Sequence, residues 1–276
     1  MHYPSSRLWE NPVTKVSPID LVARLQRPAR TRAGGVVIEL EKQRSASDPG
    51  YVCPASGLAL IDMAWIEELT YVRRRVKRGD ALFLANDQFA SIYALRNGFF
   101  KTVQGLEDGR EQVTGFQMSG EIMGMDGIDT GRYGSTALAL EDSDVCVLPY
   151  ALVANHSNRN DELQRQFHKV MSREIVREHG VMMLLGTMNA GERLAMFLLD
   201  LSRRFSARGY SASDFVLRMS RGDIGSYLAM KLETVSRAFT SLHNLGIVHV
   251  DGRHVQILDF ADLERHRGQT SRRDRD

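Results

Sequence analysis

Residues 219–258 constrain the fold of this chain more than any other stretch, because they combine two short helical patterns with a hairpin pattern. Ser220 is followed by Asp223 at the spacing of a capping box, which satisfies free N–H groups at the start of a helix. Apolar residues recur at helical spacing in the second pattern: Val235, Phe239 and Leu242. Two helices joined by a tight turn are therefore expected.

Apolar and polar residues then alternate over residues 247–258 around Asp251-Gly252, which is typical of a type I′ β-hairpin. Helix, turn, helix and hairpin is the order of a winged helix-turn-helix. The alternative is a small packed helical subdomain that carries a solvated charged stripe.

That stripe consists of Glu233, Ser236 and Arg237, which share a face of the second helix away from its apolar residues. Arginine can donate two hydrogen bonds to O6 and N7 of guanine, and glutamate can accept one from N4 of cytosine. The second helix is therefore predicted to read base edges in double-stranded DNA.

The whole chain, at 276 residues, is long enough for two domains with cores of their own. It has no apolar stretch of the roughly 20 residues that a membrane span needs, and its N-terminus lacks a secretory apolar region. Two cysteines do not make a disulfide scaffold, so we expect a cytoplasmic protein without membrane partners. The motifs of zinc proteases, serine hydrolases and phosphate-binding loops are missing from the sequence, so no enzyme is predicted.

The pattern along the chain predicts an α+β fold in five parts. Residues 1–50 are expected to be a poorly ordered extension, and closely spaced short strands over 51–160 indicate a β-sandwich or roll. A long helix is expected over 161–187, the winged helix-turn-helix over 188–262, and a mobile tail over 263–276. The strands expected are Tyr71–Val76, Ala81–Leu84, Ser91–Arg96, Phe99–Val103, Glu111–Met118 and Ser143–Leu148.

The long helix has more apolar positions than one face of a roll readily covers. Two copies packed across a two-fold axis would bury the rest in a coiled-coil-like seam, whereas the alternative is a helix packed only on its own roll. The candidate seam residues are Val170, Met171, Ile175, Glu178 and Met182. If Glu178 meets its symmetry mate, the like charges oppose dimerisation until something compensates for them.

The next helix is expected to begin at Asn189, with Glu192 completing a capping box, and to end near Gly209. The arginines at its far end are expected in solvent, with a phosphate contact by one or more of them as the alternative: Arg203, Arg204 and Arg208.

Several runs resemble one family: Glu192–Phe205, Arg221–Leu228, Glu233-Thr-Val-Ser-Arg237, Gly109–Phe116 and Gly120-Glu121. They resemble the CRP/FNR family of bacterial transcription regulators, and within it the FNR-type, oxygen-responsive branch. The resemblance covers about residues 53–258. It implies a β-roll of the cyclic-nucleotide-binding type, a dimerisation helix and a winged helix-turn-helix. It also implies a homodimer that binds a palindromic operator in double-stranded DNA and contacts RNA polymerase.

The resemblance assigns base reading to Glu233 and Arg237, with Ser236 as a third contact. Leu232 stands where the cyclic-AMP-responsive branch carries another base-reading arginine, which favours an inverted repeat of TTGAT over the TGTGA type. Further DNA contacts are expected from Ser220, Arg221, Lys231 and Thr234.

The FNR-type branch holds an iron–sulfur cluster through four cysteines. Cys53 and Cys146 match the third and fourth of these, but the first and second fall on Arg44 and Ser47. A 4Fe-4S cluster is therefore not expected, and no metal ligand is predicted. Three readings of the two cysteines stay open: ordinary small apolar residues, a disulfide redox switch, or an altered site with ligands other than cysteine, such as Asp48.

Nucleotide-binding rolls use a Gly-Glu near the ribose and an Arg-Ser pair at the phosphate. Gly120-Glu121 matches the first, but Arg132 and Ser135 are separated, so Arg132 is expected to be a solvated loop residue. The signal is left open between redox or oxygen-related control and a small ligand. The alternative function is a sensor module of the nucleotide-binding type that acts through protein partners.

Overall fold

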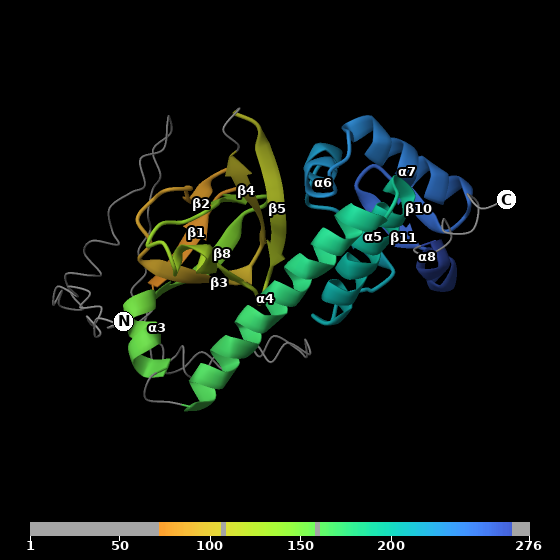
Figure 1. Ribbon diagram of the computed structural model, residues 1–276. Coiled ribbons are helices and arrows are strands. Elements are labelled where there is room, and N and C mark those ends of the chain that lie inside the picture. Colours follow the sequence, from red (N-terminus) through yellow and green to blue (C-terminus); the bar gives the residue numbers. More distant parts are fainter. Residues whose placement is uncertain (1–71, 106–108, 158–160, 267–276) are drawn as a thin grey trace, which may run out of the picture. The chain divides into compact units, whose positions relative to one another are not determined.

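The computed structural model describes residues 72–105, 109–157 and 161–266, and these form an α+β fold (Figure 1). Three sheets are present in these ranges. One has the strand order β1-β8-β3-β6, the second has β2-β7-β4-β5, and the third is a small sheet with the order β10-β11-β9.

The first two sheets make the β-roll, and all of their strand pairs are antiparallel. Their buried faces share one apolar core, to which Leu95 and Val145 contribute from one sheet and Phe100 and Ala137 from the other. The strands are β1 (Val72–Val76), β2 (Ala81–Phe83), β3 (Ser91–Asn97), β4 (Phe99–Gly105), β5 (Glu111–Met118), β6 (Ile122–Met123), β7 (Thr136–Ala139) and β8 (Ser143–Pro149). The expected strands are thus present, whereas β6 and β7 were not expected.

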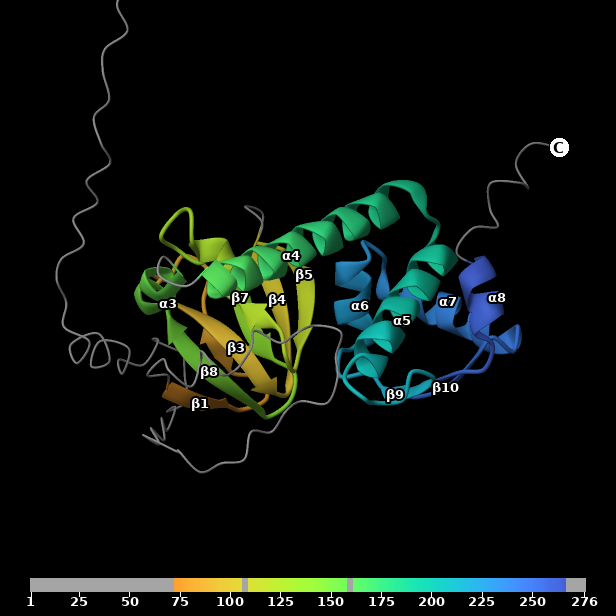
Figure 2. The ribbon, with the colours of Figure 1, turned by 90° about the horizontal axis from the view of Figure 1, so that it is seen from below.

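Three helices follow the roll: α3 (Tyr150–Ser157), α4 (Asp161–Thr187) and α5 (Ala190–Ser206). In Figure 2, α4 is the long helix that precedes α5. The capping box expected at the start of α5 is confirmed, because the Asn189 side chain accepts from the backbone N–H of Glu192 while the Glu192 side chain accepts from that of Asn189. None of the helices in the described part of the chain is long and apolar enough to cross a membrane.

The C-terminal part contains β9 (Asp214–Val216), α6 (Arg221–Tyr227), α7 (Leu232–Asn244), β10 (Val248–Asp251), β11 (His254–Ile257) and α8 (Phe260–His266). The hairpin forms as expected, but its turn is different. Asp251 pairs with His254, so the central residues are Gly252 and Arg253, and only Gly252 has a positive φ, 56°. A type I′ turn needs positive φ at both positions, so the signs match type II′ instead.

The chain does not become a tail at residue 263 as expected, because α8 continues to His266 and Leu263 is fully buried. The extension over residues 1–50 and the rest of the expected tail lie outside the described residues.

Candidate functional site

Helices α6 and α7 pack through a small apolar centre in which Ile224 and Val235 are fully buried. The predicted capping box at the start of α6 is confirmed: the Ser220 hydroxyl accepts from the backbone N–H of Asp223, and the Asp223 carboxylate accepts from that of Ser220. The turn between the helices contains Ala229 at a φ of 51°. The buried centre, the capping box and the turn together fix the orientation of α7 relative to α6.

The polar stripe of α7 lies on its outer face, opposite the buried residues Val235 and Phe239. Glu233 and Arg237 are exposed, and within the described chain neither forms a hydrogen bond or an ion pair. The Ser236 hydroxyl donates to the carbonyl of Leu232 at 3.1 Å. The structure therefore brings the three predicted base readers together on one face, with the charged groups of Glu233 and Arg237 exposed and the Ser236 hydroxyl bonded to the helix backbone.

The other expected DNA contacts differ in accessibility. Lys231 is exposed at the N-cap of α7, and Thr234 is half-buried. Arg221 instead lies over the ring of Phe239, 3.4 Å from its centroid, and donates to the carbonyl of Gly252. Partial burial lowers the pKa of Arg221 to about 10. Its visible role is to join α6, α7 and the hairpin.

Helix α6 also contacts the β-roll, which the sequence pattern did not indicate. Lys101 of β4 forms an ion pair with Asp223 at 2.6 Å, and the backbone N–H of Val113 donates to the Ser226 hydroxyl at 2.8 Å. Burial opposes the charged form of Asp223, but hydrogen bonds from Lys101 and Ser220 hold the pKa of its carboxyl below the ordinary value. One carboxylate thus caps α6 and ties it to the roll.

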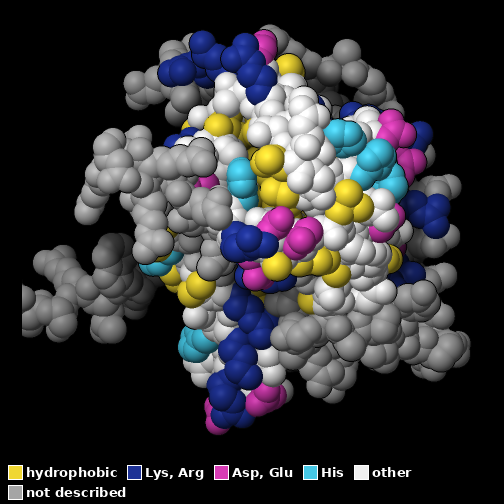
Figure 3. Space-filling view, turned by 90° about the vertical axis from the view of Figure 1, so that its right-hand side faces the viewer, with side chains coloured by type: hydrophobic (Ala, Val, Ile, Leu, Met, Phe, Trp, Pro, Cys, Tyr) yellow, Lys and Arg dark blue, Asp and Glu magenta, His cyan; other side chains and the backbone are white. Residues whose placement is uncertain are grey.

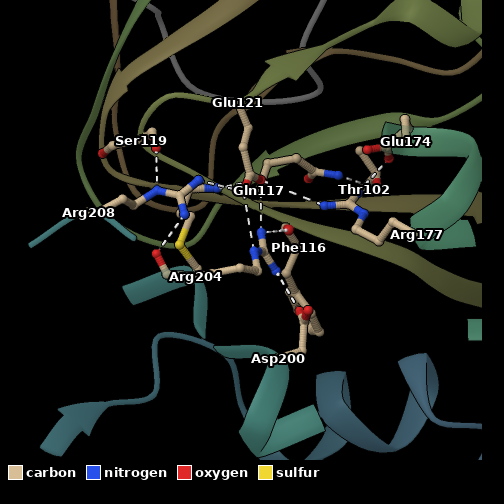
Figure 4. A network of polar contacts seen from close by, with 11 residues as sticks. Thr102, Phe116, Gln117, Ser119, Glu121, Glu174, Arg177, Asp200, Arg204 and Arg208 are labelled. Carbon is tan, nitrogen blue, oxygen red and sulfur yellow. Dashed lines mark hydrogen bonds and ion pairs between the residues drawn. The ribbon is translucent and has the colours of Figure 1, made fainter. Parts of the chain in front are cut away.

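A second set of contacts between the β-roll and the helices that follow it centres on Glu121, which lies between β5 and β6 (Figure 4). Its carboxylate accepts from Arg208 at 2.6 Å and from Arg204 at 2.8 Å, and Arg177 of α4 lies 3.7 Å away. The Arg204 and Arg208 side chains are only 14% and 2% exposed, so the expectation that they lie in solvent is wrong. They were misjudged because their partner lies far away in the sequence.

The residues at the positions that resemble a nucleotide-binding site are Glu121, Arg132 and Ser135, and their contacts are all within the protein. Glu121, which matches the ribose-binding position, is occupied by arginines of the protein itself. Ser135 donates to the carboxylate of Asp126 at 2.7 Å, and Arg132 is exposed and donates to the carbonyl of Asn86. The expectation that Arg132 is a solvated loop residue is confirmed.

Of the two candidate sensor cysteines, Cys53 lies outside the described residues. Cys146 lies on β8 with no exposed surface, in an apolar cluster with Ile92, Leu148 and Val153. Burial raises the pKa of its thiol to about 11, which disfavours the reactive thiolate. The described residues contain no group of three or more His, Cys, Asp or Glu placed to hold a metal ion. The surroundings of Cys146 are those of an apolar core residue.

The candidate seam residues on α4 differ in how exposed their side chains are. Met171, Ile175 and Met182 are 37%, 50% and 68% exposed, and Glu178 is exposed beside them. Val170 is half-buried and packs on the cluster around Cys146, so its visible contact is with its own roll.

Basic residues recur along the same helix at exposed positions, namely Arg165, Lys169 and Arg173. Figure 3 shows a run of Lys and Arg side chains near the lower edge of the molecule, where α4 begins in Figure 1.

Comparison with known proteins agrees with this arrangement. Residues 192–266 match the family described as Crp-like helix-turn-helix domain, and residues 73–160 match the cyclic nucleotide-binding domain. The chain is 41% identical over 222 residues to the transcriptional regulatory protein btr of Bordetella pertussis, covering 80% of this chain and 92% of that relative. It is 40% identical over 234 residues to the transcriptional activator protein FnrA of Stutzerimonas stutzeri, covering 83% of this chain and 94% of that relative. The structure of FixK2 from Bradyrhizobium japonicum matches with a TM-score of 0.65 and 28% identity, over 71% of this chain and 97% of that one.

Proposed function

Because this chain belongs to the CRP/FNR family of DNA-binding transcription regulators, we propose that it binds, as a homodimer, an operator made of two inverted TTGAT-like half-sites. One observation carries the proposal: α7 presents Glu233 and Arg237 on an exposed face, with no partner in the described part of the chain. A recognition helix in the major groove needs such unpaired groups at its outer edge.

The contacts divide into two classes. Arg237 and Glu233 supply sequence preference through base edges, with Ser236 beside them. Lys231 is exposed at the start of α7 and supplies affinity through a phosphate, which depends on salt and not on sequence. Leu232 is 51% exposed and offers no hydrogen bond where a further base-reading arginine would stand, which supports the TTGAT type.

The test compares duplexes with the TTGAT repeat and duplexes in which the guanine of each half-site is replaced. Arg237→Ala is expected to lose about 1–3 kcal/mol of discrimination per half-site, which is roughly fivefold to 150-fold, because the bidentate contact to guanine is removed. Fluorescence anisotropy with labelled duplexes measures both affinities.

Lys231→Ala is the matched control on the same helix. It is expected to weaken both duplexes equally and to reduce the salt dependence of binding by about one phosphate contact per subunit. Equal losses on matched and altered duplexes in Arg237→Ala would contradict the assignment of Arg237.

RNA polymerase is the second partner in this proposal, and the operator position relative to the promoter sets whether transcription rises or falls. FnrA of Stutzerimonas stutzeri is named a transcriptional activator, and we extend that role to this chain. A sensor module acting through protein partners alone would bind neither duplex, so the same measurement separates the two functions.

A further inference from the structure

The guanidinium of Arg221, the first residue of α6, contacts both α7 and the β10–β11 hairpin. Its central carbon lies 3.4 Å from the centroid of the Phe239 ring, and its Nη2 donates to the carbonyl oxygen of Gly252 at 3.0 Å. Phe239 belongs to α7, and Gly252 belongs to the turn of the hairpin. One planar group therefore holds a helix and a hairpin turn at the same time.

The ring that Arg221 covers lies on the side of α7 opposite the proposed base readers. Phe239 follows Arg237 by two residues, which is about 200° around an α-helix. Phe239 is only 3% exposed, whereas Arg237 is exposed. Because both side chains belong to one helix, a rotation of α7 that moved Phe239 off the guanidinium would also turn Arg237 away from its present direction.

The centre between α6 and α7 is otherwise apolar, with Ile224, Leu228 and Val235 fully buried. Apolar packing is non-directional, so it holds the two helices together better than it fixes their rotation. A guanidinium that stacks on a ring and donates at one edge fixes both a plane and a direction. Lysine supplies the same charge without the plane, so it cannot replace arginine in this arrangement.

The position of Arg221 works against stability. Among the described residues it has no ion-pair partner, and its Nη1 is buried without a hydrogen-bond partner. Burial lowers the pKa of Arg221 to about 10. An unpaired buried donor and an unneutralised charge both oppose folding. Such a local conflict is more typical of a functional position than of a core position.

We propose that Arg221 is a positioning residue for sequence recognition, which touches no base but holds α7 and the hairpin in one fixed relation and so sets the angle at which Arg237 meets guanine. This inference rests on the proposed function, because it concerns how α7 reads an operator. A contact from Arg221 to a phosphate would instead give affinity without sequence preference, so the two roles are separable.

The variant Arg221→Lys keeps the charge but removes the planar stack and the directed bond to Gly252. Fluorescence anisotropy on the full-length protein compares the TTGAT repeat with the duplex in which the guanines are replaced. The ratio of the two affinities is expected to fall at least about threefold, while the salt dependence stays that of the wild type. A protein that was merely less stable would lose both affinities by the same factor, because only the folded fraction binds, and its ratio would not change.

Phe239→Leu tests the same contact from the other side, because it removes the ring but keeps the guanidinium and an apolar side chain. It is expected to lower the affinity ratio as Arg221→Lys does. The double variant should lose little more than either single variant, because both changes remove one shared contact. Arg265→Lys is the matched control, since it changes an exposed arginine of α8 that pairs with Asp262, and it should leave the ratio unchanged.

An unchanged ratio in Arg221→Lys, or losses that add in the double variant, overturns the proposal. The proposal also fails if Arg221→Gln weakens both duplexes equally with a smaller salt dependence while Arg221→Lys behaves as the wild type, because that result assigns Arg221 to a phosphate.

Hydrogen exchange on the full-length protein without DNA tests the contact independently of any operator. In Arg221→Lys the backbone amides of residues 248–257 should exchange severalfold faster, whereas those of residues 194–201 in the buried part of α5 should exchange as in the wild type. Unchanged exchange in the hairpin, or faster exchange in both segments, contradicts the proposal. If the wild type prefers neither duplex, the proposed function fails, while the exchange rates still decide whether Arg221 holds the hairpin.

Discussion

At the scale of single residues, Glu121 is a largely buried carboxylate that pairs with three arginines. Burial opposes its charged form, but Arg204, Arg177 and Arg208 together hold the pKa of its carboxyl below the ordinary value of 4.5. Removing the charge leaves buried guanidinium groups without their counter-ion, which in general costs about 3–5 kcal/mol.

Glu121→Gln should therefore lower the free energy of unfolding by roughly 3 kcal/mol at neutral pH. A carboxyl whose folded pKa is lowered stabilises the fold above its unfolded pKa, and that contribution is lost as the pH falls through the folded pKa. The difference between wild type and Glu121→Gln should thus shrink as the pH falls below 4.5. Urea titrations over a pH series measure it.

Glu162→Gln serves as the control, because it breaks an exposed pair with Arg165 and should hardly move the urea midpoint. A Glu121→Gln midpoint equal to that of the control at neutral pH would show that the network does not stabilise the fold.

Residue-scale prediction from sequence failed where the partner was distant. Nothing near Arg204 or Arg208 in the chain reveals Glu121, which lies 83 and 87 residues earlier in the sequence. The exposed side chains Glu233 and Arg237 were placed correctly because helical periodicity alone separates them from the buried face.

At the scale of elements, local signals were enough for both capping boxes and for α7, but not for β6, β7 and β9. Those strands span 2, 4 and 3 residues, too short to show a period, and they exist through pairing with β3, β4 and β11. The turn of the β10–β11 hairpin differed because Asp251 pairs with His254 and so belongs to the strand.

Helix α6 offers a matched test of close packing in the helix-turn-helix. A Cβ added at Gly225 would lie 2.6 Å from the carbonyl oxygen of Met230, whereas one at Gly222 would meet nothing closer than 3.6 Å. Gly225→Ala should destabilise the protein by about 1–3 kcal/mol through overpacking, and Gly222→Ala should be neutral or stabilise it by up to about 1 kcal/mol. Thermal unfolding of the two variants gives the comparison, and equal midpoints would contradict the close approach.

At the scale of the whole molecule, the proposed homodimer would cover the exposed apolar side chains of α4. Met171, Ile175 and Met182 fall at spacings of four and seven, with Glu178 between Ile175 and Met182, and this is the spacing expected of a coiled-coil seam. The sequence predicted this stripe from periodicity, and Val170, which was counted with it, is half-buried and packs on its own roll.

Ile175→Glu should convert the dimer to a monomer, because a second carboxylate beside Glu178 adds repulsion and hydration cost at the seam. Val176→Glu is the control, since Val176 is 66% exposed on the same helix but outside the seam spacing, and that variant should stay dimeric. Sedimentation velocity distinguishes the two states.

Operator binding should differ in the same way between the monomeric variant Ile175→Glu and the dimeric variant Val176→Glu. A monomer contacts one half-site, so Ile175→Glu should lose most of its affinity for the inverted repeat while keeping its preference for guanine through Arg237. If Val176→Glu dissociates and Ile175→Glu does not, the two-fold axis passes along a different face of α4. In that case the dimer forms through that other face of α4, and that dimer sets the spacing at which the two recognition helices meet successive turns of DNA.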